Sequence, residues 1–254
     1  MMRSRSRQGH GFTLIEMMLA LVAGLIVSAA ALSFFLSSMK SNGEYVQSTR
    51  LTQELRNSLD LITRDLRRAG YDEKALGYLA TGAASPLTHI CRTTGGSSTC
   101  ITNGSVADCV IYAYDSGNSL AVDGQVDLGY GEVRGLRRRT ATINGVANTG
   151  IIEYAVSSGI TRPSCSDASA TYTTYPATCN GVWCPLSDPT RVNVTSLTFT
   201  DVGGAAGGVQ LRNLNVVLKG QLTGSTTFTR GVKAGVRIRS DCFDPTLSNC
   251  NTSP

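Results

Sequence analysis

The sequence has few of the residues and motifs on which catalysis depends. Its 254 residues include only two histidines, His10 and His89. It has no phosphate-binding P-loop, no G-x-G-x-x-G motif after a strand and no H-E-x-x-H motif. His89 lies in a stretch rich in glycine, serine and threonine, so we interpret it as a solvated loop residue. We therefore predict that the chain is not an enzyme and holds no cofactor or metal.

Charged residues are also scarce near the N-terminus, where Glu16 is the only one between Phe12 and Met39. At about 1.5 Å per residue this run makes a helix of ~42 Å, more than the ~20 residues that a bilayer core needs. We therefore expect it to span a lipid bilayer. A carboxylate so deep in an apolar segment is costly and requires a partner. The run supplies none, so the partner is the α-amino group of a neighbouring copy or another membrane protein.

The residues before this run form a recognisable signal. A basic leader is followed by Gly11-Phe12-Thr13-Leu14-Ile15-Glu16 and then by the apolar helix. This combination resembles the class III signal of type IV pilins and of type II secretion pseudopilins. The alternative is an ordinary signal peptide, which has a shorter apolar region and a small-residue cleavage site after it.

The resemblance implies roles for individual residues. A prepilin peptidase would cut after Gly11, and Phe12 would become the N-methylated N-terminus. Thr13 and Glu16 would serve assembly, with Glu16 pairing with the N-terminal amine of the adjacent subunit. Arg3, Arg5 and Arg7 hold the leader in the cytoplasm, and their removal lowers the formal charge from +5 to +2. So small a charge gives little reason to expect nucleic-acid binding.

All the cysteines lie after the apolar helix, in the part expected to be exported. They are Cys91, Cys100, Cys109, Cys165, Cys179, Cys184, Cys242 and Cys250. An even number in an oxidising compartment indicates disulfides, although the 105 possible connectivities are not resolved by sequence. The alternative is zinc, but only Cys179 and Cys184 have close spacing and histidines are few. We expect Cys242–Cys250 first, because that segment is short and terminal.

The helix is expected to continue beyond the membrane to Ala69, ahead of the stop signal Gly70. Its apolar positions recur every three or four residues, at Leu51, Leu55, Leu59, Ile62, Leu66 and Ala69. Ser41-Asn42-Gly43 is expected to bend or loosen it, and Asp60 to pair with Arg64.

The remaining chain alternates between strands and loops. Strands are predicted at 110–114, 133–143, 151–156, 192–199, 211–218 and 228–238, with an Asn144-Gly145 turn. Residues 71–107 and 164–189 are expected to be irregular segments, 203–208 a flexible connector and 242–250 a tail loop.

A long N-terminal helix followed by antiparallel strands predicts an α+β fold in which the apolar helix face packs on the sheet. This is also the pilin architecture. The helix end Arg64-Asp65-Leu66-Arg67-Arg68-Ala69-Gly70-Tyr71 resembles that of PilW-type minor pilins, which are related to the J-type minor pseudopilins. The expected organisation is a cleaved leader (1–11), a transmembrane assembly helix (12–39), an amphipathic helix (40–70) and a β-rich domain with disulfide-stapled loops (71–254).

Two further clusters have alternative interpretations. Asp115, Asn118, Asp123 and Asp127 are spaced so that their oxygens could ligate calcium, but such residues are also common in turns. Arg134, Arg137, Arg138 and Arg139 form the only basic cluster after the leader, with Arg137 and Arg139 on one strand face and Arg138 on the other. A solvated edge that blocks strand pairing is favoured over contact with DNA or with another minor pilin.

The resemblance makes the leading hypothesis a minor pilin that primes or caps type IV pilus assembly. Its implied partners are major and minor pilins, prepilin peptidase and the inner-membrane assembly platform. The chain would be a single-pass inner-membrane protein with a periplasmic domain, extracellular once it is in a pilus. The rivals are a minor pseudopilin of type II secretion and a filament-tip adhesin or DNA receptor.

Overall fold

The structure, a computed structural model, describes residues 11–73, 85–94, 97–101, 104–116, 126, 128–159, 161–168, 174–175, 182–207, 209–225, 228–238 and 241–243. The chain divides into two compact units after Gln47. The long helix α1 (Leu14–Leu66) contributes to both.

In the first unit α1 is a helix whose side chains are all exposed from Leu14 to Gln47. It is long and apolar enough to cross a membrane. The helix continues through Ser41, Asn42 and Gly43, so the loosening expected there is not observed.

In the second unit the predicted apolar face of α1 is confirmed. Leu51, Leu55, Leu59, Ile62 and Leu66 are all buried, as is Ala69 just beyond the helix. The helix ends at Leu66, slightly earlier than expected, and a turn leads to Gly70. Gly70 has a φ of 75°, the left-handed conformation that favours glycine at a helix end. No ion pair joins Asp60 and Arg64 among the described residues, so that predicted pair is wrong.

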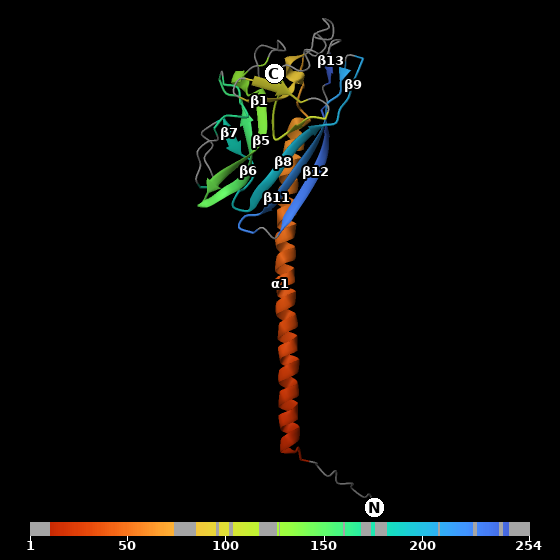
Figure 1. Cartoon of the computed structure of the whole chain (residues 1–254), viewed down its shortest axis with the longest axis vertical. Helices are drawn as coiled ribbons and strands as arrows, with labels where there is room; N and C mark the ends of the chain where they lie inside the picture. Colours follow the sequence, from red (N-terminus) through yellow and green to blue (C-terminus); the bar gives the residue numbers. More distant parts are fainter. Residues whose placement is uncertain are drawn as a thin grey trace, which may run out of the picture. The chain divides into compact units, whose positions relative to one another are not determined.

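The strands pair antiparallel in three sheets, which gather around the C-terminal part of α1 (Figure 1). The six-stranded sheet has the order β2 (Ser97–Cys100), β1 (Ile90–Thr94), β4 (Cys109–Ala113), β5 (Val133–Ile143), β6 (Val146–Val156), β7 (Trp183–Pro185). The four-stranded sheet has the order β12 (Thr229–Arg237), β11 (Asn213–Leu222), β8 (Val192–Asp201), β3 (Val106–Ala107). The smallest sheet has the order β13 (Cys242–Phe243), β10 (Val209–Gln210), β9 (Ala205–Ala206). Two short 3-10 helices, η1 (Pro86–Thr88) and η2 (Leu128–Tyr130), lie in the connections.

All the predicted strands are present, and the α+β fold is confirmed. Asn144 and Gly145 have φ values of 51° and 77°, as a two-residue hairpin turn with two left-handed positions requires. The irregular segment expected at 71–107 is partly wrong, because β1 and β2 form a hairpin there and β3 follows. The connector at 203–208 contains β9, and the tail begins with β13.

The main core lies between α1 and the sheets and includes residues of β4, β5, β6, β8, β11 and β12. A second, smaller core lies around Trp183. Strand β4 belongs to both, since Val110 and Tyr112 are in the first core and Cys109 and Ile111 in the second. It is therefore buried on both faces. The backbones of β6 and β8 approach so closely that a Cβ at Gly150 would lie 1.8 Å from the carbonyl oxygen of Val194.

Candidate functional site

The start of α1 is capped by the side chains of the signal itself. Thr13 is the residue before the first helical residue, Leu14. The Glu16 carboxylate Oε2 accepts hydrogen bonds from the backbone N–H and the hydroxyl of Thr13, both at 2.9 Å. The Glu16 N–H in turn donates to Thr13 Oγ1 at 3.4 Å. This reciprocal capping box gives Thr13 and Glu16 a role within their own helix, which the Thr-x-x-Glu spacing would have predicted.

The peptide bond between Gly11 and Phe12 lies outside the helix. Both residues are exposed, and a Cβ built on Gly11 has nothing within 4 Å. The described part of the chain therefore imposes no steric need for glycine at this position. Any such need comes from a molecule that binds this segment.

The four arginines of β5 do not form one surface. Arg134 lies 3.8 Å from Asp65 of α1, and the Arg138 guanidinium donates to the Val194 carbonyl oxygen at 2.7 Å. Arg137 and Arg139 both donate to the Asp167 carbonyl oxygen, which confirms their predicted common face. Strand β5 lies between β4 and β6, so the expected solvated edge is wrong.

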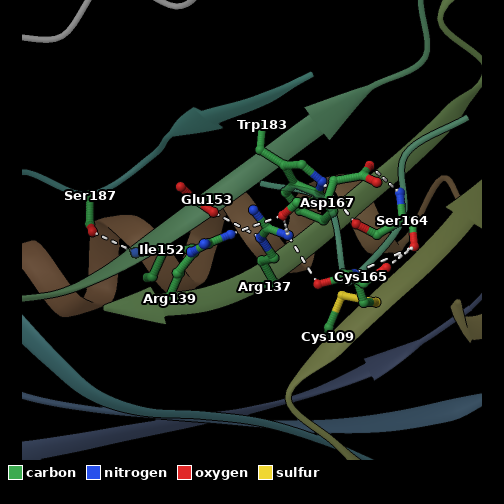
Figure 2. A network of polar contacts seen from close by, with 11 residues as sticks. Cys109, Arg137, Arg139, Ile152, Glu153, Ser164, Cys165, Asp167, Trp183 and Ser187 are labelled. Carbon is green, nitrogen blue, oxygen red and sulfur yellow. Dashed lines mark hydrogen bonds and ion pairs between the residues drawn. A yellow bond between two sulfur atoms is a disulfide. The ribbon is translucent and has the colours of Figure 1, made fainter. Parts of the chain in front are cut away.

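Arg137 is instead the centre of a buried polar network (Figure 2). Its Nε donates to Glu153 at 2.8 Å, and the two side chains are only 4% and 0% exposed. The guanidinium also lies 4.0 Å from the centre of the Trp183 ring. A Cβ at Gly135 would lie 2.6 Å from that ring. The absence of a side chain at Gly135 therefore leaves the space on β5 that the indole occupies. Sequence reasoning missed Glu153 and Trp183, because both contacts depend on tertiary structure.

The same network holds the segment around Cys165 on the sheet. Arg137 donates to the carbonyl oxygens of Cys165 and Asp167 at 3.0 and 2.8 Å, and the Trp183 indole N–H donates to that of Ser164 at 3.0 Å. A disulfide joins Cys165 to Cys109 on β4 (Figure 2). We interpret the arrangement as structural, because the charges of Arg137 and Glu153 neutralise each other within the fold.

The described cysteines are all oxidised. Cys91–Cys100 links β1 to β2, Cys109–Cys165 is described above, and Cys184 and Cys242 are also disulfide-bonded. Cys179 and Cys250 lie outside the described residues, so the expected Cys242–Cys250 pair stays a prediction. No group of residues that could hold a metal ion occurs within the described part of the chain.

We therefore predict that the exported protein contains no free thiol. A thiol-reactive maleimide added to the denatured but unreduced protein should label none of the described cysteines, whereas prior reduction should expose them all. Mass spectrometry of the labelled peptides is the measurement. Labelling of several cysteines before reduction would contradict the disulfides and revive the zinc interpretation.

Two other predicted sites change in the structure. His89 is 3% exposed, so the expectation that it is solvated is wrong. Of the proposed calcium ligands only Asp115 is described, and Asn118, Asp123 and Asp127 lie outside the described residues.

Asp65 joins the end of α1 to the six-stranded sheet. Its carboxylate accepts hydrogen bonds from the hydroxyls of Tyr112 and Tyr114, and Arg134 stacks over the Tyr114 ring at 4.6 Å. Burial and the negative charge of Asp65 raise the pKa of Tyr112 well above its ordinary value. The same two causes raise the pKa of Tyr114, so both hydroxyls remain donors to Asp65 at neutral pH.

Comparison with known protein families gives two matches. A family described as prepilin peptidase-dependent protein B matches residues 44–238, which is more than half of the chain. The prokaryotic N-terminal methylation motif matches residues 6–32 and so includes Gly11, Phe12, Thr13 and Glu16. Neither the curated proteins nor the solved structures include a match to the chain.

Proposed function

The chain belongs to the family of prepilin peptidase-dependent protein B, and we propose that this minor pilin-like protein primes or caps the assembly of a type IV pilus. Its apolar helix and prepilin signal make it a single-pass protein of the inner membrane. We place its β-rich domain in the periplasm, and outside the cell once the subunit enters a pilus. No enzymatic role is part of the proposal.

The observation that carries this proposal is the arrangement at the start of α1. The Gly11–Phe12 bond is exposed and precedes the helix, and the capping box begins one residue later. Cleavage there would remove residues 1–11 and leave the helix cap intact. A protein so processed keeps its whole membrane helix, which is what a subunit needs in order to pack beside other pilin helices.

Glu16 supports subunit pairing as well as capping. Its hydrogen bonds to Thr13 use Oε2, and no described residue bonds to Oε1, so Oε1 can receive the N-terminal amine of a neighbouring subunit. Opposite charges at about 4 Å attract by roughly 4 kcal/mol at an effective dielectric constant near 20. An interaction of this size would favour docking of one helix against the next.

The test compares two substitutions of Glu16 in a strain lacking the chromosomal gene. Glu16→Gln keeps an oxygen that can cap the helix but removes the charge, whereas Glu16→Ala removes both. We expect both variants to be inserted, cleaved and oxidised, and both to restore far fewer pili than the wild type. The measurement is the number of surface pili together with co-purification of other pilin subunits.

The control is Glu44→Gln, which removes an exposed charge from the same helix beyond the apolar run. It should assemble as the wild type does. Normal assembly by Glu16→Gln would show that capping is the whole role of Glu16.

If loss of the gene abolishes protein secretion and leaves pili intact, the chain is a type II secretion pseudopilin. If it abolishes surface or DNA binding with normal pilus number, the chain is a tip receptor. Its gene neighbourhood separates the first two systems independently.

A further inference from the structure

A concave, basic cleft lies where the end of α1 meets β4 and β5. It has a volume of about 600 Å³, within the range of about 300–1,000 Å³ that is typical of ligand pockets. The side chains that define it are Arg64, Arg67, Arg68, Arg134, Tyr71 and Tyr114. We call this the arginine cleft. All of these residues belong to the second compact unit.

Among the residues that the structure describes, the arginine cleft carries more positive charge than its carboxylates balance. Asp115 is the one acidic side chain among its described lining residues. Asp65 lies beside it and is already engaged by Tyr112, Tyr114 and Arg134. Among the described residues no carboxylate lies within 4.0 Å of the guanidinium groups of Arg64, Arg67 or Arg68. The cleft therefore offers guanidinium donors to an anion from outside the chain.

The helix dipole alone does not account for this arrangement. Basic residues in or just after the last turn of a helix are favoured by its exposed carbonyl groups, which would explain Arg64 on α1 and Arg67 and Arg68 in the turn after it. The helix dipole does not explain Arg134, which comes from β5 and is held in place by Asp65 and by the Tyr114 ring. Residues from the end of α1, from the turn after it, from the segment after β4 and from β5 thus converge on one hollow.

An apolar cavity of about 200 Å³ adjoins the arginine cleft. Its apolar lining is Leu61, Ile62, Leu136, Tyr154 and Leu186. Arg64, Arg68 and Arg134 line both hollows, so the two lie side by side. Leu61 lines the apolar cavity, and 49% of its surface is exposed. An occupant of both hollows would present an apolar side chain beside one or more carboxylates.

We propose that the arginine cleft docks an acidic segment of a neighbouring pilin-like subunit. The segment's aspartate or glutamate side chains bind the guanidinium groups of Arg64, Arg67 and Arg68, because arginine binds carboxylates in a two-pronged geometry. An adjacent apolar side chain of the segment covers Leu61 and enters the neighbouring cavity. The inference rests on the proposed function in one respect, namely that the chain works among other pilin-like subunits.

Charge distribution favours a peptide over a nucleic acid. A polynucleotide is bound by basic residues that follow its backbone over several phosphates. The basic residues of β5 next to Arg134 do not extend the arginine cleft, because Arg137 and Arg138 bind Glu153 and the Val194 carbonyl oxygen. An inorganic anion, in turn, would leave the adjoining apolar cavity unfilled.

The experiment uses the full chain in its own membrane. A photoreactive benzophenone amino acid replaces Leu61, and the cross-linked peptide is identified by mass spectrometry. We expect a peptide from another pilin-like subunit with an aspartate or glutamate within a few residues of the cross-link. Charge reversal by Arg64→Glu together with Arg67→Glu should reduce the yield by at least about tenfold, since like charges then face each other.

Arg56→Glu is the matched control, because Arg56 is an exposed arginine of the same helix outside the arginine cleft. It should leave the yield unchanged. Replacing the partner's acidic residue by lysine should restore cross-linking to the charge-reversed chain. Oxidation of the cysteines and the thermal melting curve confirm that each variant is folded.

Several results would overturn the inference. These are a cross-link to nucleic acid or to a protein that is not pilin-like, the absence of any cross-link, and a yield that charge reversal does not change. Failure of the proposed function has a different signature, in which pilus number is normal without the gene and no pilin-like subunit co-purifies with the wild type. If the charge-reversed chain still co-purifies with pilin-like subunits and cross-links with the wild-type yield, the docking role of the arginine cleft is wrong. The proposed function is then unaffected.

Discussion

Replacing Gly11 by glutamate should leave the entire population of the protein as uncleaved precursor in the membrane. The described part of the chain leaves room for a side chain at this position, because a Cβ on Gly11 would meet none of its atoms within 4 Å. The requirement for glycine is therefore expected to come from the peptidase, whose active site must accept the backbone beside the scissile bond. Immunoblotting separates the precursor from the shorter product, and mass spectrometry of the wild type should find Phe12 as a methylated N-terminus.

Gly43→Glu provides a control with the same chemical change. Gly43 is also exposed, also lies in the first unit and also has nothing within 4 Å of a built Cβ. It lies beyond the apolar run, so this variant should be processed normally. A mature N-terminus other than Phe12, or efficient cleavage of Gly11→Glu, would show that the class III interpretation is wrong for this chain.

Features set by local patterns could be predicted from the sequence. The buried face of α1 follows from leucines and isoleucine at steps of three and four residues, because these positions share one side of a helix. The Asn144–Gly145 turn follows from the ease with which these two residue types adopt positive φ. The β1–β2 hairpin had no such pattern, because its sequence, rich in serine, threonine and glycine, lacks alternating apolar residues. Cys91 and Cys100, which face each other across it, link its two strands.

The buried ion pair could not be predicted, because its register depends on an irregularity. Ile143 pairs with Val146 beside the turn, and a regular hairpin from there would place Arg137 opposite Ile152. The register shifts between Ala141 and Ile143, near Asn148, which has a φ of 57°. This bulge places Arg137 opposite Glu153. An arginine-rich strand that looked solvated therefore has an internal partner.

The arginine cleft was hidden for a related reason. Arg64, Arg67 and Arg68 lie off the apolar face of α1, which predicts only that they are exposed. Their convergence with Arg134 depends on how α1 packs against β4 and β5. Asp65, in the middle of this arginine-rich helix end, gave no sign of binding tyrosines on and just after β4, more than forty residues away.

Removal of the Glu153 charge should destabilise the β-rich domain more than any surface substitution. Glu153→Gln leaves the Arg137 guanidinium buried without its counter-charge, and breaking a buried ion pair in this way costs about 3–5 kcal/mol. Arg137 also donates to the Cys165 and Asp167 carbonyl oxygens, so it cannot turn away without breaking those bonds. We therefore expect a fall of that size in the free energy of unfolding.

Trp183 makes this effect directly measurable. It is the only tryptophan in the chain, is fully buried and stacks on Arg137, so its fluorescence reports on this network. Urea unfolding of the full chain in detergent, with the disulfides kept oxidised, gives the free energy of unfolding for each variant. Glu54→Gln is the control, because the Glu54–Arg191 pair is largely exposed, and such a pair contributes only about 0–1 kcal/mol.

A double substitution separates two contributions to the free energy of unfolding. One is the cost of leaving a single buried charge unpaired, and the other is the net stabilisation by the Arg137–Glu153 pair. Arg137→Met combined with Glu153→Leu leaves no unpaired charge in the core, so it should be less destabilised than the sum of the two single variants. The double variant should still be less stable than the wild type, because the Cys165 and Asp167 carbonyl oxygens lose the hydrogen bonds that Arg137 donates. If Glu153→Gln unfolds at the same urea concentration as Glu54→Gln, the ion pair does not hold this face of the sheet together. The segment around Cys165 would then depend on the disulfide to Cys109 and on the Trp183 hydrogen bond to Ser164.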